Sequence, residues 1–151
     1  MSFAPFKTVL LASTLMTAAA LAPCAMAQGA PAAETAPAVP QGRLADAVIP
    51  SAYRLDLSVD PSKTRFGGHV EIDTEIKAPS RFIWLHGNGL AVSKAVVTIA
   101  GQTHVGAWKQ VDPSGVALLS FDAPLPAGKA TFAFDYDAAF HEGPDGMFRV
   151  K

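Results

Sequence analysis

Four histidines have the widest chemical repertoire in this chain: His69, His86, His104 and His141. His141 is followed by Glu142, which together form the opening of the H-E-x-x-H motif of zinc proteases. That motif needs a second histidine one helical turn later, so that both rings face one metal, but the residue there is Asp145. Gly143 and Pro144 also disfavour the helix that this geometry requires. We therefore expect His141 to be a loop residue and not a zinc ligand.

The other polar side chains form no catalytic set. Carboxylates at alternate positions from Glu71 to Glu75 share one face of an expected strand with His69, which is the pattern of a solvated face. Asp135 and Asp137 lack the spacing of a calcium-binding loop. Serine nucleophile elbows, phosphate-binding glycine loops and basic aromatic patches are absent from the sequence. The sequence thus predicts no catalytic, cofactor-binding or metal-ligating residue in this chain.

Two tryptophans could stack on a sugar if they were exposed. Trp84 lies within the apolar run 81–86, so we expect it in the core, whereas the pattern around Trp108 favours neither placement. His86 ends the same run, where a hydrogen-bonded structural histidine is expected.

Charge is evenly balanced beyond residue 27, with 11 basic and 13 acidic residues and a formal net charge of −2. This balance gives no indication of a nucleic-acid or anionic-membrane partner. The lone cysteine is Cys24, so the chain beyond it has no thiol for a disulfide or a cysteine metal site.

Residues 1–27 have the pattern of a cleavable signal peptide. Lys7 supplies the positive start, and an uncharged apolar stretch follows. Ala25-Met26-Ala27 is a small-x-small cleavage site, which predicts cleavage between Ala27 and Gln28 and an exported, periplasmic or extracellular product with no stable membrane insertion. A lipidated Cys24 is disfavoured by the proline directly before it, and an uncleaved anchor is disfavoured by the nearby cleavage site.

Residues 28–42 are rich in alanine and proline and have no apolar periodicity, which predicts a disordered linker. From Arg43 onward the pattern has period two. The runs 53–59 and 70–77 alternate apolar and polar residues on either side of a turn, which predicts an antiparallel hairpin with one buried face.

Later short runs, separated by turns about every ten residues, raise the expected total to about seven strands. The predicted fold class is all-β, an antiparallel β-sandwich or saddle-like sheet.

The segments from Arg43 to Lys151 resemble the N-terminal domain of zinc aminopeptidases similar to aminopeptidase N. The resemblance rests on segments that follow one another in the family's order: Val48-Ile49-Pro50-Ser51-Ala52-Tyr53-Arg54-Leu55-Asp56-Leu57, Phe66-Gly67-Gly68-His69-Val70-Glu71-Ile72, Ile83-Trp84-Leu85-His86, Pro124-Leu125-Pro126-Ala127-Gly128 and Gly146-Met147-Phe148-Arg149. Ala45 departs from the leucine-proline pair that is usual at the start.

The resemblance implies a full-length enzyme that removes single residues from peptide N-termini with one zinc ion. None of its zinc, catalytic or amine-binding motifs is found in these 151 residues, so no site residue is carried over. We expect a non-catalytic leading part of the domain, incomplete at its C-terminus, with the parent's catalytic domain as its partner and peptides as the parent's substrates. A free-standing exported module that binds a sugar or a protein is the alternative.

A domain that lacks its neighbours should leave part of its apolar face bare. From the sequence, this bare face is expected to involve Ile72, Ile76, Phe132 and Phe134.

Overall fold

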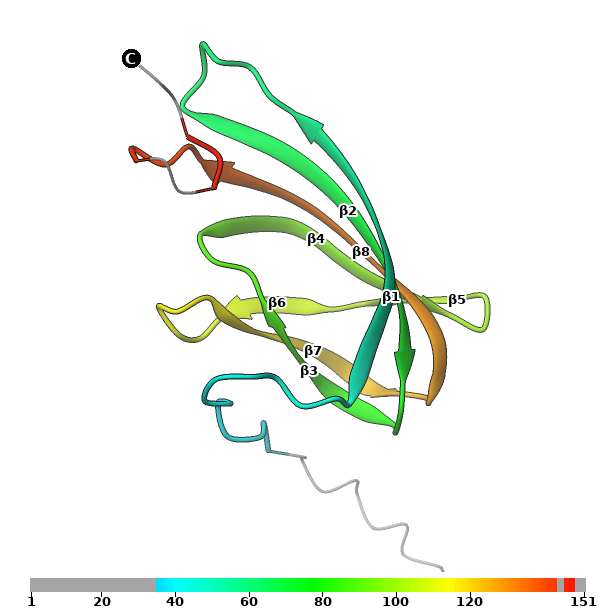
Figure 1. Ribbon diagram of the computed structural model, residues 1–151. Coiled ribbons are helices and arrows are strands. Elements are labelled where there is room, and N and C mark those ends of the chain that lie inside the picture. The colour runs from blue at the N-terminus through cyan, green and yellow to red at the C-terminus, as the bar shows by residue number, and fades with distance from the viewer. Residues whose placement is uncertain (1–34, 144–145, 149–151) are drawn as a thin grey trace, which may run out of the picture. The chain divides into compact units, whose positions relative to one another are not determined.

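The computed structural model describes residues 35–143 and 146–148, and they form an all-β structure (Figure 1). Eight strands follow one another: β1 (Val48–Ser58), β2 (Arg65–Ile76), β3 (Ser80–His86), β4 (Leu90–Ile99), β5 (Gln102–Val105), β6 (Ala107–Gln110), β7 (Val116–Leu125) and β8 (Gly128–Ala139). A five-stranded sheet has the order β1-β2-β8-β4-β5, and a three-stranded sheet has the order β3-β7-β6. All pairings between these strands are antiparallel, which confirms the predicted fold class.

The predicted hairpin is present as β1 and β2, in a register that places Leu55 opposite Val70. The turn between the strands is stabilised by Asp60, whose carboxylate accepts hydrogen bonds from the amide and the hydroxyl of Ser62. This is the local hydrogen bonding by which aspartate favours turns.

The structure has eight strands where about seven are expected. The additional strand is β5, which forms because the chain reverses direction directly after β4. β4 and β5 are joined by Ala100 and Gly101, which both have positive φ, at 49° and 77°. Two consecutive positive φ values are the signature of a type I′ hairpin turn, for which asparagine and glycine are the usual residues. Because alanine occupies the first position, the sequence lacks the asparagine-glycine pair that would predict this turn.

The core lies between the two sheets. Phe132 and Val97 on the large sheet, and Leu119 and Leu125 on the small one, are at most 1% exposed. Ile76 and Phe134 are also buried, so three of the four residues expected on a bare face belong to the core instead. β8 is the middle strand of its sheet, and both of its neighbours and the small sheet shield its apolar side chains.

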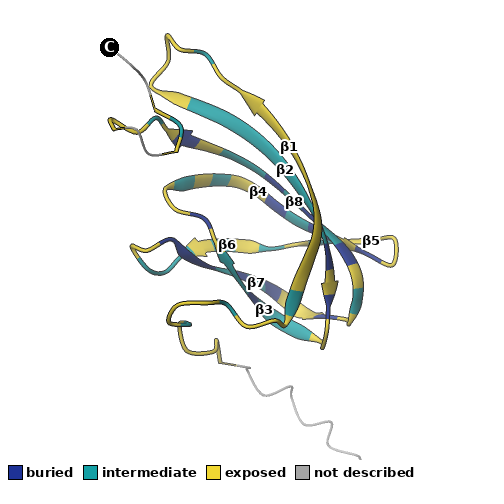
Figure 2. Cartoon of the chain, in the orientation of Figure 1, coloured by how far each residue is buried: buried dark blue, intermediate teal, exposed yellow. Residues whose placement is uncertain are grey.

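The uncovered apolar surface lies on β1. Residues directly opposite each other in an antiparallel pair share a face, so Tyr53 and Leu55 lie on the same face as the core residues of β2. Tyr53, Leu55 and Leu57 are nevertheless 64%, 54% and 43% exposed. Figure 2 shows β1 exposed along nearly its whole length, in contrast to β8. The prediction of a buried face for this run is therefore wrong, because the small sheet does not reach over β1.

The expectation that Trp84 lies in the core is wrong, and Trp108, for which the sequence favoured neither placement, packs there instead. Trp108 packs against the core and makes an edge-on contact with Phe134, with 5.7 Å between ring centroids. Trp84 directly follows the buried Ile83 on β3, so its side chain lies on the opposite face of the strand. There it lines a surface pocket together with Leu44 and Ala45. An apolar run of six residues does not reveal which alternate positions face inward, since both sides carry large side chains.

Candidate interaction site on strand β1

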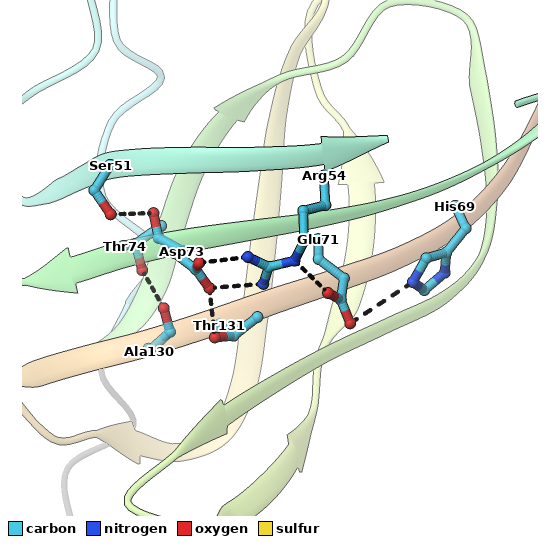
Figure 3. A network of polar contacts seen from close by, with 8 residues as sticks. All are labelled: Ser51, Arg54, His69, Glu71, Asp73, Thr74, Ala130 and Thr131. Atoms are coloured by element: carbon cyan, nitrogen blue, oxygen red, sulfur yellow. Dashed lines mark hydrogen bonds and ion pairs between the residues drawn. The ribbon is translucent and has the colours of Figure 1, made fainter. Parts of the chain in front are cut away.

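A network of charged side chains covers the outer face of the β1–β2 hairpin (Figure 3). The Arg54 Nε donates to Glu71 at 2.8 Å, and its two terminal nitrogens donate to both carboxylate oxygens of Asp73 at 2.7 and 3.0 Å. Thr131 on β8 donates its hydroxyl to Asp73 at 2.8 Å. The hairpin register produces this network, since Arg54 lies directly opposite Glu71.

The network favours the charged forms of Asp73 and Arg54. The hydrogen bond from Arg54, followed by the one from Thr131, lowers the pKa of Asp73 below its usual value. The two carboxylates in turn raise the pKa of Arg54, with Asp73 as the larger cause. The side chains of Arg54, Glu71 and Asp73 are 53%, 39% and 34% exposed. Because water screens ion pairs of this exposure, each pair adds little to the stability of the fold.

His69 continues this face toward β8. Its Nδ1 lies 2.5 Å from a carboxylate oxygen of Asp135, and its Nε2 lies 4.0 Å from Glu71. The side chains of His69 and Asp135 are each 40% exposed, so the expected solvation is only partial. The pairing follows from the register, in which these two residues are directly opposite. Arg65 and Asp137 form a further ion pair on this face.

The other face of β1 is apolar, and we call its residues Tyr53, Leu55 and Leu57 the β1 strip. Beside the strip, on the same face of the sheet, Gly68 leaves room for the ring of Tyr136. A Cβ at Gly68, which lies opposite Leu57, would overlap ring atoms of Tyr136 on β8. The strip is thus an exposed apolar row on one face of β1, with the charged network on the reverse face. Such an arrangement can bind another polypeptide, and it contains no group arranged for catalysis.

The remaining positions singled out in the sequence give no catalytic centre. His86 is exposed and lines an apolar crevice with Trp108, and the ring has no hydrogen-bond partner in the part of the chain that the structure describes. The expectation of a hydrogen-bonded histidine is therefore wrong, since His86 is the last residue of β3 and its side chain is exposed. Ala27 and Gln28 lie outside the described residues, as does Asp145.

His141 is a loop residue, as expected. It forms an isolated bridge with Phe148, and its amide donates to the carbonyl of Met147 at 2.8 Å. This backbone course is not helical, so it does not provide the helix face that a zinc-binding H-E-x-x-H motif needs. Across residues 35–143 and 146–148, no group of three or more metal-ligating side chains could hold a metal ion. The donor set there does not fit a zinc site.

The same described residues contain no helix long and apolar enough to cross a membrane.

A two-sheet antiparallel β domain with an uncovered edge strand is the class of protein that these features define. The family model for the Peptidase M1 N-terminal domain matches residues 49–151. The chain belongs to this family.

Three relatives give the scale of the similarity. Aminopeptidase M1-C of Oryza sativa subsp. japonica is 29% identical over 113 residues, which cover 74% of this chain and 12% of the relative. Aminopeptidase M1-D of the same plant is 27% identical over 113 residues, covering 74% and 13% of the two chains. Aminopeptidase N of Acetobacter pasteurianus is 24% identical over 107 residues, covering 71% and 29%.

The chain thus spans about an eighth to under a third of the length of these relatives. All three are aminopeptidases, which supports the N-terminal part of an aminopeptidase and gives no support to a free-standing binding module.

Proposed function

We propose that this chain is the leading part of the N-terminal β domain of an exported, zinc-dependent aminopeptidase. In this proposal the zinc site, which supplies an activated water for peptide hydrolysis, belongs to the remainder of the parent. The family match across residues 49–151 carries the proposal.

The role of this chain in the parent is structural. The β1 strip exposes three large apolar side chains on a packed sheet, and a surface of this kind marks a contact with another polypeptide. The remainder of the parent, including its catalytic domain, covers the strip and buries it. The outer network around Arg54 stays in water, because ion pairs of this exposure are not suited to a dry interface.

The gene itself tests this proposal. The nucleotides beyond codon 151 should encode, in one of the three frames, a zinc-binding H-E-x-x-H motif with a downstream glutamate ligand. A stop codon followed by an unrelated gene would refute the assignment to a longer enzyme.

Export is tested on the protein. We expect the mature chain to begin at Gln28, because Ala25-Met26-Ala27 is the only well-placed small-x-small site at the end of the apolar stretch. Mass spectrometry of the N-terminus measures this directly. A chain that retains Met1, or one that carries a lipid on Cys24, would contradict it.

A further inference from the structure

The outer edge of β1 carries no strand within the described residues. β1 is the terminal strand of its sheet, with β2 on one side only. The one irregularity in its pairing lies between Pro50 and Ala52, so Ala52–Ser58 is a regular stretch. This stretch contains no proline, and its two charged residues, Arg54 and Asp56, have opposite signs and so do not repel a strand that carries the same pair. Its free backbone groups are therefore available to another strand.

The side chains along this edge form a pattern that is symmetric about Leu55. Tyr53, Leu55 and Leu57 lie on the inner face and are exposed. On the outer face a cation, Arg54, precedes Leu55, and an anion, Asp56, follows it. A strand with this order matches a copy of itself running in the opposite direction.

We propose that two copies of this chain associate through their β1 edges as an antiparallel pair, with the two-fold axis at Leu55. Arg54 then lies opposite the Asp56 of the second copy, and this pair occurs twice by symmetry. Tyr53 lies opposite the second copy's Leu57 on the apolar face, so that each β1 strip covers the flank of the other. The two large sheets become one continuous sheet.

The register follows from faces and charges. A two-fold axis normal to the sheet keeps each inner face on the same side, so a shift by one residue is excluded because it would oppose inner and outer side chains. A slip that moves the axis to Arg54 places Arg54 opposite itself, and a slip to Asp56 places two carboxylates face to face. Like charges directly opposite each other are destabilising. The Leu55-centred register avoids both and also uses all of Ala52–Ser58.

Arg54 and Asp56 both keep hydrogen-bonding capacity for this contact. Arg54 uses one bond to Glu71 and two to Asp73, which leaves two of its five N–H donors. Its side chain is 53% exposed. Asp56 is exposed and forms no ion pair within the part of the chain that the structure describes. The bonds to Glu71 and Asp73 draw the Arg54 guanidinium toward β2, so pairing with the second copy's Asp56 requires it to turn toward the free edge.

This inference uses only the edge of the chain itself and does not depend on the proposed function. In a longer parent, a strand of that parent would compete for the same edge.

Sedimentation equilibrium of the exported chain tests the dimer. We expect a reversible monomer–dimer equilibrium in the micromolar range with no larger species. Leu55→Lys places two ammonium groups together at the axis and should weaken dimerisation by about tenfold or more. Val105→Lys is the matched control, because Val105 is 77% exposed on another strand, and it should leave the dimer unchanged. Far-ultraviolet circular dichroism and a thermal melt verify that each variant folds.

Cysteine cross-linking tests the register, since the chain has no cysteine beyond Cys24. Leu55→Cys should cross-link with itself under mild oxidation. Tyr53→Cys alone should not, whereas a mixture of Tyr53→Cys and Leu57→Cys should. A monomer at every concentration would overturn the proposal and leave the edge to a strand of the parent. A dimer that is indifferent to Leu55→Lys, or cross-linking as efficient for Val105→Cys as for Leu55→Cys, would overturn it as well.

Discussion

Two donors on different strands converge on the carboxylate of Asp73. Arg54 on β1 and Thr131 on β8 both bond to it, so this side chain links three adjacent strands on the outer face. Its lowered pKa means that the folded state favours the ionised form, with Arg54 as the larger cause. A carboxyl group whose pKa is lowered by folding stabilises the folded state at every pH above the group's usual pKa. This stabilisation is lost as the pH falls from the usual pKa through the lowered one.

We therefore expect Asp73→Asn to be less stable than the wild type at neutral pH. The difference should shrink below about pH 4, where the carboxyl of the unfolded chain takes up a proton while the folded one stays ionised to lower pH. Thr131→Val removes only the second donor and should show a smaller effect of the same sign. Urea unfolding at a series of pH values measures both. A difference that stays constant from neutral pH to pH 2 would show that the ionised form is not favoured.

Gly68 and Gly67 are a natural pair for comparison, since they are neighbours on one strand but face opposite sides of the sheet. A Cβ at Gly68 would overlap the ring of Tyr136, whereas a Cβ at Gly67 would meet nothing closer than the Tyr136 carbonyl oxygen at 3.9 Å. We expect Gly68→Ala to lower the free energy of unfolding by about 1–3 kcal/mol through overpacking. Gly67→Ala should be neutral or stabilising, because glycine within a strand is itself unfavourable.

The effect of Gly68→Ala should largely disappear in a Tyr136→Ala background, and a double-mutant cycle followed by urea unfolding measures this coupling. An unchanged cost in that background would mean that the ring of Tyr136 is not what excludes the methyl group.

At the residue scale, the sequence places Arg54, His69 and the acidic side chains on polar faces but does not reveal their partners. Partners depend on which strands are neighbours, and β8 lies more than 50 residues after β2 in the sequence. The β1–β2 hairpin register, once assumed, would have found Arg54 opposite Glu71. The contact of His69 with Asp135 needs the long-range pairing of β2 with β8, which no local pattern specifies.

The strands themselves follow from alternation and turn residues, and the existence of most of them is predictable for this reason. Alternation also identifies which residues of a strand share a face. It does not tell whether that face is covered, because coverage depends on how far the opposite sheet extends. For this reason Tyr53 and Phe132 have the same pattern but very different exposure, at 64% and 1%.

Phe132→Ala and Leu55→Ala compare the covered and the uncovered parts of the same face. Phe132 is buried on the middle strand and belongs to the core, so its truncation should cost about 3–5 kcal/mol of unfolding free energy. Leu55 is 54% exposed, so its truncation should change the stability of the monomer by no more than about 0.5 kcal/mol. Chemical denaturation at low protein concentration, where the chain is monomeric, measures both. Equal losses would mean that the small sheet covers β1 after all.

For the whole molecule, the family was accessible from sequence because its segments occur in a fixed order. The β1 strip was not accessible, since it results from the relative extents of the two sheets. The matched residues span about an eighth of the plant relatives, and the chain presents an apolar strip of the kind that contacts another polypeptide. This polypeptide is the rest of the parent in the proposed function and a second copy in the isolated chain.

The whole chain should show no aminopeptidase activity by itself. Zinc hydrolases of this kind hold the metal with three protein ligands and keep a position open for water, and the described residues offer no such group. His141 and Glu142 lie in a non-helical loop, so they are not carried on the helix that a zinc-binding H-E-x-x-H motif needs. We expect the purified chain with added zinc to hydrolyse aminoacyl chromogenic substrates no faster than a control without protein.

His141→Ala should be indistinguishable from the wild type in this assay and in its melting temperature with and without zinc. Turnover that a chelator abolishes, that zinc restores and that His141→Ala removes would place a metal centre in this chain and contradict its structural role.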